Sequence, residues 1–150
     1  QDNPAASALA VVEDLHRTVA DATFAGIALQ VRMGVATGTV CAGTVGGNDR
    51  LTYTVYGATV NLAQRLQAAN RELGTVALAC EQTISAARAA KGGTSAASAW
   101  QSRAPVRVAG FTEPIGIYEL AKAGSHVGAD VMTDPEPGAD VRGRTAAAIA

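Results

Sequence analysis

The sequence is poor in aromatic residues, in cysteine and in net charge. Phe, Trp and Tyr make up only 4% of its 150 residues, and the net charge of -1 provides no basic field that would attract a nucleic acid. No apolar run approaches the ~20 residues that span a bilayer, and the N-terminal QDNPAAS lacks the charged start and apolar segment of a signal peptide. We therefore expect a cytoplasmic protein that contacts neither nucleic acid nor membrane through this chain.

The few cysteines and histidines do not predict a metal site. Cys41 and Cys80 lie far apart without a CxxC spacing, and each falls in an apolar, strand-like run, so both are predicted to be buried free thiols. His16 and His126 form no ligand pattern and are interpreted as structural or solvated. The 48% hydrophobic content is sufficient for the core of one globular domain.

The stretch from Val31 to Leu66 contains the patterns on which the interpretation of the rest of the chain depends. Residues 27–36 alternate in polarity, which predicts a strand with one buried face formed by Ile27, Leu29, Val31, Met33 and Val35. Glycines are dense over 34–47 and predict close backbone approach and a tight turn at GGND. GTVGGNDR lacks the GK[ST] ending of a phosphate-binding P-loop, so a hairpin is the better interpretation.

A second alternating run over 51–56 predicts another strand, which stops at Gly57 where a helix starts. That helix has an apolar stripe formed by Leu62, Leu66 and Ala69. Asn61 and Arg65 lie one turn apart beside the stripe and are predicted to project from the same side of a rigid element. Without further context, a solvated Asn and Arg on an amphipathic helix would be the simpler explanation.

Four blocks supply that context: GVATGTVCAGTVG, RLTYT, YGATVNLAQRL and VRVAGFTEPIGIYEL. In content, order and spacing over residues 27–120 they resemble the class III nucleotidyl cyclase catalytic domain. The resemblance implies a ferredoxin-like α+β fold, conversion of ATP to cyclic AMP and pyrophosphate, two Mg²⁺ or Mn²⁺ ions, and an active site shared across a homodimer or with a complementary cyclase half.

The resemblance also assigns residue roles. Asn61 matches the Asn that orients the ribose, and Arg65 matches the Arg that stabilises the transition state. Thr54 falls at the base-specifying position, where Thr is common in bacterial enzymes, although a plain strand threonine is an alternative. Arg50 matches a basic position near the polyphosphate, and a solvated turn arginine explains it equally well.

Two departures from the family pattern stand out. The metal-binding aspartates of the family lie in a first strand and a hairpin that do not precede the first helix here, so we expect this chain to be the C-terminal portion of the domain, with its metal ligands elsewhere. Because open sheet edges would then remain, we expect that the isolated chain folds incompletely, associates with another copy, or was excised from a larger protein. Ala109 replaces a phosphate-binding Lys that the family places just before Gly110.

The remaining chain predicts helices over 4–21 and 81–90 and strands over 76–80, 106–108 and 115–120. Asn3 and Pro4 are expected to start the first helix, whose core stripe would be Ala8, Val12, Leu15 and Val19. Residues 91–103 are expected to be a loop that carries Trp100 as a packing anchor. The domain is expected to cover residues 1–122, followed by a flexible tail over 123–150.

Two functions from different classes follow. The first is part of an adenylate cyclase catalytic domain that cannot cyclise ATP unaided. The second is a degenerate cyclase-like module that binds a nucleotide or a partner without turnover, which the substitution at Ala109 favours and the retention of Asn61 and Arg65 disfavours. A purely structural α+β domain explains neither Asn61 with Arg65 nor Thr54 at this spacing.

Overall fold

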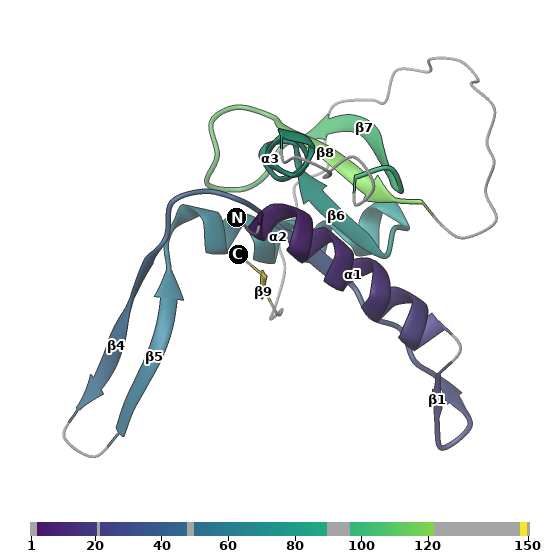
Figure 1. Cartoon of the computed structure of the whole chain (residues 1–150), viewed down its shortest axis with the longest axis horizontal. Coiled ribbons are helices and arrows are strands. Elements are labelled where there is room, and N and C mark those ends of the chain that lie inside the picture. The colour runs from purple at the N-terminus through teal and green to yellow at the C-terminus, as the bar shows by residue number, and fades with distance from the viewer. Residues whose placement is uncertain (1–2, 21, 48–49, 90–96, 122–147, 150) are drawn as a thin grey trace.

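The computed structural model describes residues 3–20, 22–47, 50–89, 97–121 and 148–149. Helices cover both faces of a five-stranded mixed sheet, which confirms the predicted α+β class (Figure 1). The strand order in the sheet is β7-β8-β6-β3-β9. Among these residues, no helix combines the length and the apolar character needed to cross a bilayer.

The centre of the sheet is formed by two short parallel strands. β3 (Met33–Val35) runs parallel to β6 (Ala77–Cys80), with Gly34 opposite Leu78. β8 (Ile115–Leu120) pairs antiparallel with β6, and β7 (Trp100–Val106) pairs antiparallel with β8. β9 (Ala148–Ile149) lies parallel to β3 on its other side.

One face of the sheet is covered by α1 (Pro4–Ala20) and α3 (Glu81–Ala89). Asn3 caps α1 as predicted, because its Oδ1 accepts hydrogen bonds from the backbone N–H groups of Ala5 and Ala6. Its Nδ2 also donates to the Ala86 carbonyl at 2.7 Å, which ties α1 to α3. The shared core on this face includes Leu9, Val12, Met33, Val35, Ile84 and Trp100.

The other face is covered by α2 (Ala58–Leu73), which ends at Gly74 in the left-handed conformation. Leu62, Ala63 and Leu66 of α2 pack with Leu78 and Ile117 of the sheet. A Cβ on Gly34 would stand 2.5 Å from the Gln67 backbone nitrogen and closer still to the Ala63 carbonyl oxygen. The helix therefore lies directly on the backbone of β3, which only glycine permits at this position.

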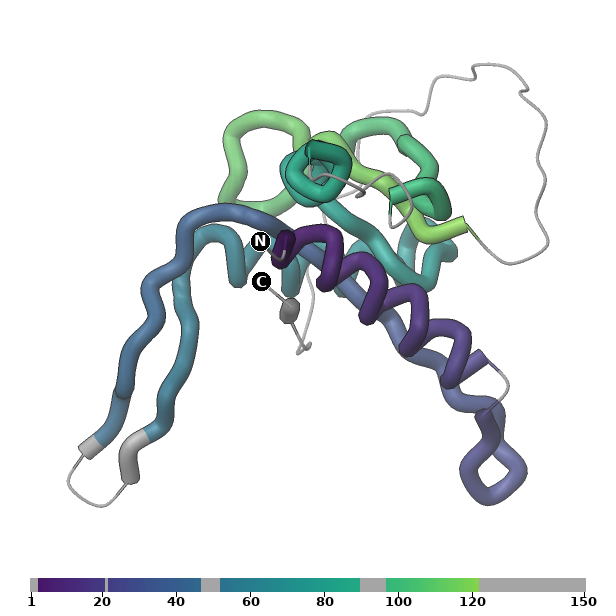
Figure 2. The backbone as a smooth tube through the Cα atoms, in the orientation of Figure 1, coloured from purple at the N-terminus to yellow at the C-terminus, as the bar shows by residue number. Residues whose placement is uncertain are grey.

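Two hairpins extend from opposite sides of this body (Figure 2). The short one joins β1 (Thr23–Phe24) to β2 (Ile27–Ala28) through Ala25 and Gly26, which both have positive φ. The long one pairs β4 (Cys41–Gly47) with β5 (Arg50–Tyr56) in antiparallel register, and β5 leads directly into α2. The predicted hairpin and the helix start at Gly57 are confirmed, whereas the Asn-Asp tip of the GGND turn lies outside the described residues.

The predicted strand over 27–36 is wrong in extent and in burial. Ile27 belongs to the short hairpin and is 71% exposed, and only Met33–Val35 join the main sheet. Met33 and Val35 do share a buried face, but α2 buries the opposite face at Gly34 and Ala36 as well. The central position of β3 between two helical layers explains why alternation did not indicate an exposed face.

Two burial predictions also fail. Cys41 is exposed, because β4 extends away from the body, whereas Cys80 is buried as predicted. In α1 the buried residues are Ala5, Leu9 and Val12, while Leu15 is 39% exposed. The C-terminal half of α1 runs past the sheet toward the short hairpin (Figure 1) and has less to pack against.

β7 begins at Trp100 and ends at Val106, so the predicted strand over 106–108 shares only Val106 with it. The predicted loop over 91–103 is wrong for its last four residues, and its residues 91–96 lie outside the described residues. Most side chains of β7 are exposed, which removed the apolar signal. Trp100 is the packing anchor that was predicted, since it is 3% exposed and donates from Nε1 to Glu13 Oε1 at 3.0 Å. Of the predicted tail, Ala148 and Ile149 form β9, and residues 123–147 and 150 lie outside the described residues.

Candidate functional site

The corner between β5 and α2 positions the candidate catalytic residues. Gly57 has φ 143°, a value that favours glycine, and its carbonyl accepts the first helical hydrogen bond from the Asn61 N–H at 3.2 Å. The Thr59 hydroxyl donates to the Thr39 carbonyl at 2.9 Å and so joins the first turn of α2 to the segment between β3 and β4. This turn is therefore fixed by side-chain as well as backbone contacts.

Asn61 and Arg65 lie one turn apart on α2, outside its buried face. Asn61 is exposed and Arg65 is half-buried, while the residues between them include the buried Leu62 and Ala63. Neither side chain makes a hydrogen bond or ion pair with another residue in the part of the chain that the structure describes. An amide that can both donate and accept, and an uncompensated guanidinium, are thus presented together from an anchored helix.

Thr54 and Arg50 lie on β5 at different distances from that helix. Thr54 is exposed and faces Gly43 across the hairpin, two residues before the end of the strand. Arg50 is opposite Gly47 at the far end, and a rise of about 3.3 Å per residue separates it from Tyr56 by about 20 Å. Asn61 and Arg65 therefore lie together on α2, Thr54 lies two residues before the end of the strand that leads into this helix, and Arg50 lies at the far end of that strand.

Ala109 lies on a tight turn beside the core. Its neighbour Val108 is buried against α2, the Phe111 N–H donates to the Val108 carbonyl at 3.0 Å, and Gly110 has φ 83°. A methyl group thus occupies the place where the resemblance leads one to expect a cation.

The described residues do not fit a divalent metal site. No group of three or more His, Cys, Asp or Glu side chains converges among them. Several carboxylates already have partners: Asp14 pairs with Arg17 at 2.9 Å and Glu119 with Arg103 at 2.8 Å. Glu13 accepts from Trp100, and burial raises its pKa above the ordinary value.

The other end of α2 is fixed by a residue that was not among the predicted site residues. Asn70 is fully buried, and its Nδ2 donates to the carbonyls of Met33 at 2.8 Å and Leu66 at 3.0 Å. Its Oδ1 accepts from the Thr75 hydroxyl at 2.7 Å. An Asn four residues after Leu66, on the apolar stripe itself, was the signal that could have revealed it.

Comparison with known proteins identifies the family. The model of the adenylate and guanylate cyclase catalytic domain matches residues 4–120. This chain belongs to that family. Asn61, Arg65, Thr54 and Arg50 all lie within the matched range.

The proteins that resemble the chain include one curated relative and two solved structures. Adenylate cyclase 1 of Rhizobium meliloti (strain 1021) is 42% identical over 73 residues, which is 48% of this chain but only 11% of that protein. A bacterial light-regulated adenylyl cyclase aligns with a TM-score of 0.54 at 19% identity, covering 82% of this chain and 34% of that one, and shows the shared fold. The adenylyl cyclase CyaB from P. aeruginosa aligns with a TM-score of 0.48 at 25% identity, covering 81% and 56%.

Proposed function

We propose that this chain forms part of an adenylate cyclase active site that converts ATP to cyclic AMP and pyrophosphate. The observation that carries the proposal is that Asn61 and Arg65 lie one turn apart on a helix anchored at both ends, with no hydrogen-bond or ion-pair partner for either side chain among the described residues. The family membership supplies the reaction, and the 42% identity to an adenylate cyclase supports ATP as the substrate.

In this proposal the two helix residues act on different parts of the nucleotide. The Asn61 amide hydrogen-bonds the ribose and aligns the 3′ oxygen with the α-phosphorus. Arg65 donates to phosphoryl oxygens as negative charge develops on them, and a guanidinium can bind two such oxygens at once. Thr54, at the start of the same corner, accepts a hydrogen bond from the adenine amino group.

Other parts of the site come from outside the described residues. The Mg²⁺ or Mn²⁺ ligands that the family uses are proposed to lie elsewhere in the full protein or in a second subunit, and the isolated chain is predicted to be inactive. Arg50 lies about 20 Å along β5 from the helix. It would then contact the polyphosphate only in a site completed by the rest of the protein or by a second subunit. The exposed apolar side chains Val45, Tyr53 and Tyr56 on the long hairpin support a homodimer or a complementary half as the partner.

The experiment is a cyclase assay with Mn²⁺-ATP and Mn²⁺-GTP on this chain expressed with its flanking native coding sequence. Asn61→Ala and Arg65→Ala are each expected to lower cyclic AMP formation by about 10²–10³-fold, the cost of one preorganised donor. Gln64→Ala removes an exposed amide from the same helix and is the matched control. Cyclic AMP made by the isolated chain, or full activity in both variants, would contradict the proposal.

The second candidate is a cyclase-like module that binds without turnover. The neutral Ala109 beside the buried Val108 favours it, because it removes a cation that the family uses for phosphate. Nucleotide binding without turnover in every version, with Ala109→Lys failing to restore turnover, would establish this candidate instead.

A further inference from the structure

A pocket of about 400 Å³ lies at the opposite end of α2 from Asn61. It is bounded by the C-terminal part of α1, by residues 29–32 and by the last turn of α2 with the residues that follow. Arg71 lies ten residues after Asn61, which corresponds to about 15 Å along the helix. The pocket is therefore separate from the corner where the proposed catalytic residues lie.

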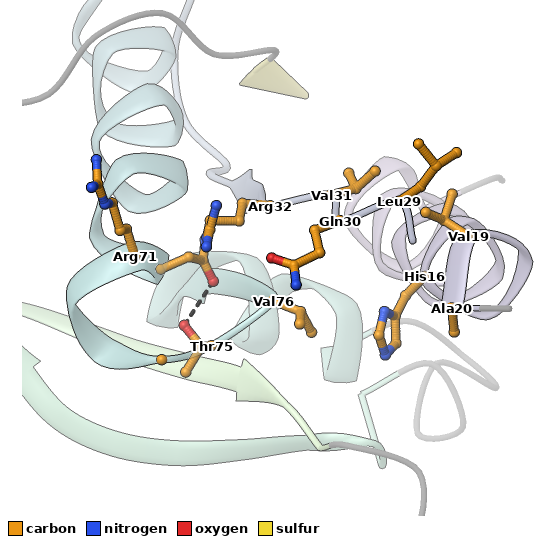
Figure 3. A pocket seen from close by; sticks show the side chains of 12 residues that line it. His16, Val19, Ala20, Leu29, Gln30, Val31, Arg32, Arg71, Thr75 and Val76 are labelled. Carbon is orange, nitrogen blue, oxygen red and sulfur yellow. Dashed lines mark hydrogen bonds between the residues drawn. The ribbon is translucent and has the colours of Figure 1, made fainter. Parts of the chain in front are cut away.

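The two sides of the pocket differ in chemistry. In Figure 3 the apolar side chains of Val19, Leu29 and Val31 stand on the side of α1, whereas Arg71 and Arg32 stand on the side of α2. Gln30 extends between the two sides. The pocket thus offers apolar side chains, with the His16 imidazole beside them, for a ligand body, and polar, cationic groups for its head.

The positive charge of the pocket is not balanced by its lining. No lining residue carries a carboxylate, and neither Arg32 nor Arg71 makes a hydrogen bond or ion pair in the part of the chain that the structure describes. On the neighbouring α1, Asp14 is already paired with Arg17, and Glu13 accepts from Trp100. Both arginines are exposed and free to turn toward an anion at the mouth of the pocket.

The floor of the pocket is rigid. Asn70 is buried there; its Nδ2 donates to the Met33 carbonyl of β3 and its Oδ1 accepts from the hydroxyl of Thr75 in the next loop. Gly74, in the left-handed conformation, has no atom within 4 Å of the place where a Cβ would be, so the helix end leaves open space beside this floor. The floor beneath a bound ligand is thus fixed before binding, while the two exposed arginines turn toward the anion.

We propose that this pocket binds a small organic anion, with its apolar body against Val31 and Leu29 and its carboxylate or phosphate held by Arg32 and Arg71. The volume lies in the usual range for small-molecule sites, about 300–1,000 Å³. A guanidinium group can donate two parallel hydrogen bonds to two oxygens of either head group. The proposal does not depend on the cyclase activity, because it uses none of the residues assigned to that reaction.

The test is an amide NMR titration of the full chain with phenyl phosphate, phenylacetate, inorganic phosphate and benzyl alcohol. Phenyl phosphate or phenylacetate is expected to shift the amide signals of Val31, Gly74 and Thr75, and the shifts should reach saturation in the millimolar range. The probe that binds more tightly identifies the preferred head group. Inorganic phosphate and benzyl alcohol, each lacking one half of the recognised chemistry, are expected to bind at least about tenfold more weakly.

The double variant R32Q/R71Q should weaken binding of the better probe by about tenfold or more, since it removes both cations while leaving the floor intact. Arg107→Gln removes an exposed arginine outside the pocket and should leave the affinity unchanged. The proposal is overturned if no probe saturates by about 10 mM, if R32Q/R71Q binds as well as the unaltered chain, or if the shifts map to Arg65 and Asn61 instead.

Discussion

The Thr59 hydroxyl donates a 2.9 Å hydrogen bond to the Thr39 carbonyl, across twenty residues of sequence. Gly38 makes this contact possible, because a Cβ at that position would stand 2.5 Å from Thr59 Oγ1. The bond connects the turn that carries Asn61 to the chain that leaves β3. The orientation of the candidate catalytic helix is thus set partly by a side chain outside the candidate site.

Replacing Thr59 with Val should lower the free energy of unfolding by about 1 kcal/mol, the net contribution of one such hydrogen bond. The two side chains have nearly the same shape, so the loss would report the bond and not a cavity. Urea denaturation of both proteins measures it. Thr52→Val, at an exposed position of β5, is the control, and an equal loss there would show that the effect is not specific to Thr59.

Gly34→Ala should destabilise the domain by about 1–3 kcal/mol or more, because the added methyl group would meet the backbone of α2. Gly43→Ala adds the same methyl group in β4, where no atom lies within 4 Å, and should leave the stability nearly unchanged. Thermal unfolding of the pair followed by circular dichroism gives the comparison. Equal melting temperatures would mean that α2 does not lie on β3 as described.

Asn70→Ala should cost at least about 2 kcal/mol, since it leaves the buried Met33 carbonyl and the Thr75 hydroxyl without their partner. Asn61→Ala removes the same side chain from an exposed position of the same helix and should change the stability by less than about 0.5 kcal/mol. Chemical denaturation at neutral pH distinguishes the two. A reversed order would contradict the burial of Asn70.

Glu13 should make the stability depend on pH in the weakly acidic range. Burial raises the pKa of this carboxyl above 4.5, so the folded state binds its proton more tightly than the unfolded state does. The stabilisation from this group is complete below the unfolded pKa and is lost as the pH rises through the folded pKa. Glu13→Gln keeps an acceptor for Trp100 and should flatten this decline, as denaturation curves from pH 4 to pH 7 would show; an unchanged slope would exclude Glu13 as its source.

The local features of the sequence predicted the elements around the candidate site well. Asn3 with Pro4, and Gly57 before α2, marked the starts of two helices through backbone requirements that do not depend on distant contacts. The placement of Asn61 and Arg65 outside the buried face followed from the helical spacing of Leu62 and Leu66 in the same way.

The failures come from packing that sequence patterns do not contain. Alternation at β3 indicated one buried face, but whether a second helix covers the other face depends on α2 folding back onto Gly34. Cys41 looked like a core residue because its neighbours are apolar, and nothing in those neighbours shows that β4 leaves the body. The separation of Arg50 from Asn61 likewise depends on the direction in which the hairpin projects.

The long hairpin also has an energetic consequence. Among the described residues no layer covers β4 and β5, and an uncovered pair of strands is marginally stable in water. Tyr53, at 72% exposure, gains little from burial against them. The β4 and β5 amides should therefore exchange with solvent through local opening far faster than those of β3 and β6. In the proposed cyclase, Thr54 lies on this hairpin. Binding of adenine by Thr54 would therefore require the hairpin to lose conformational entropy. A partner that orders the hairpin beforehand would raise the affinity for the nucleotide without contacting the nucleotide.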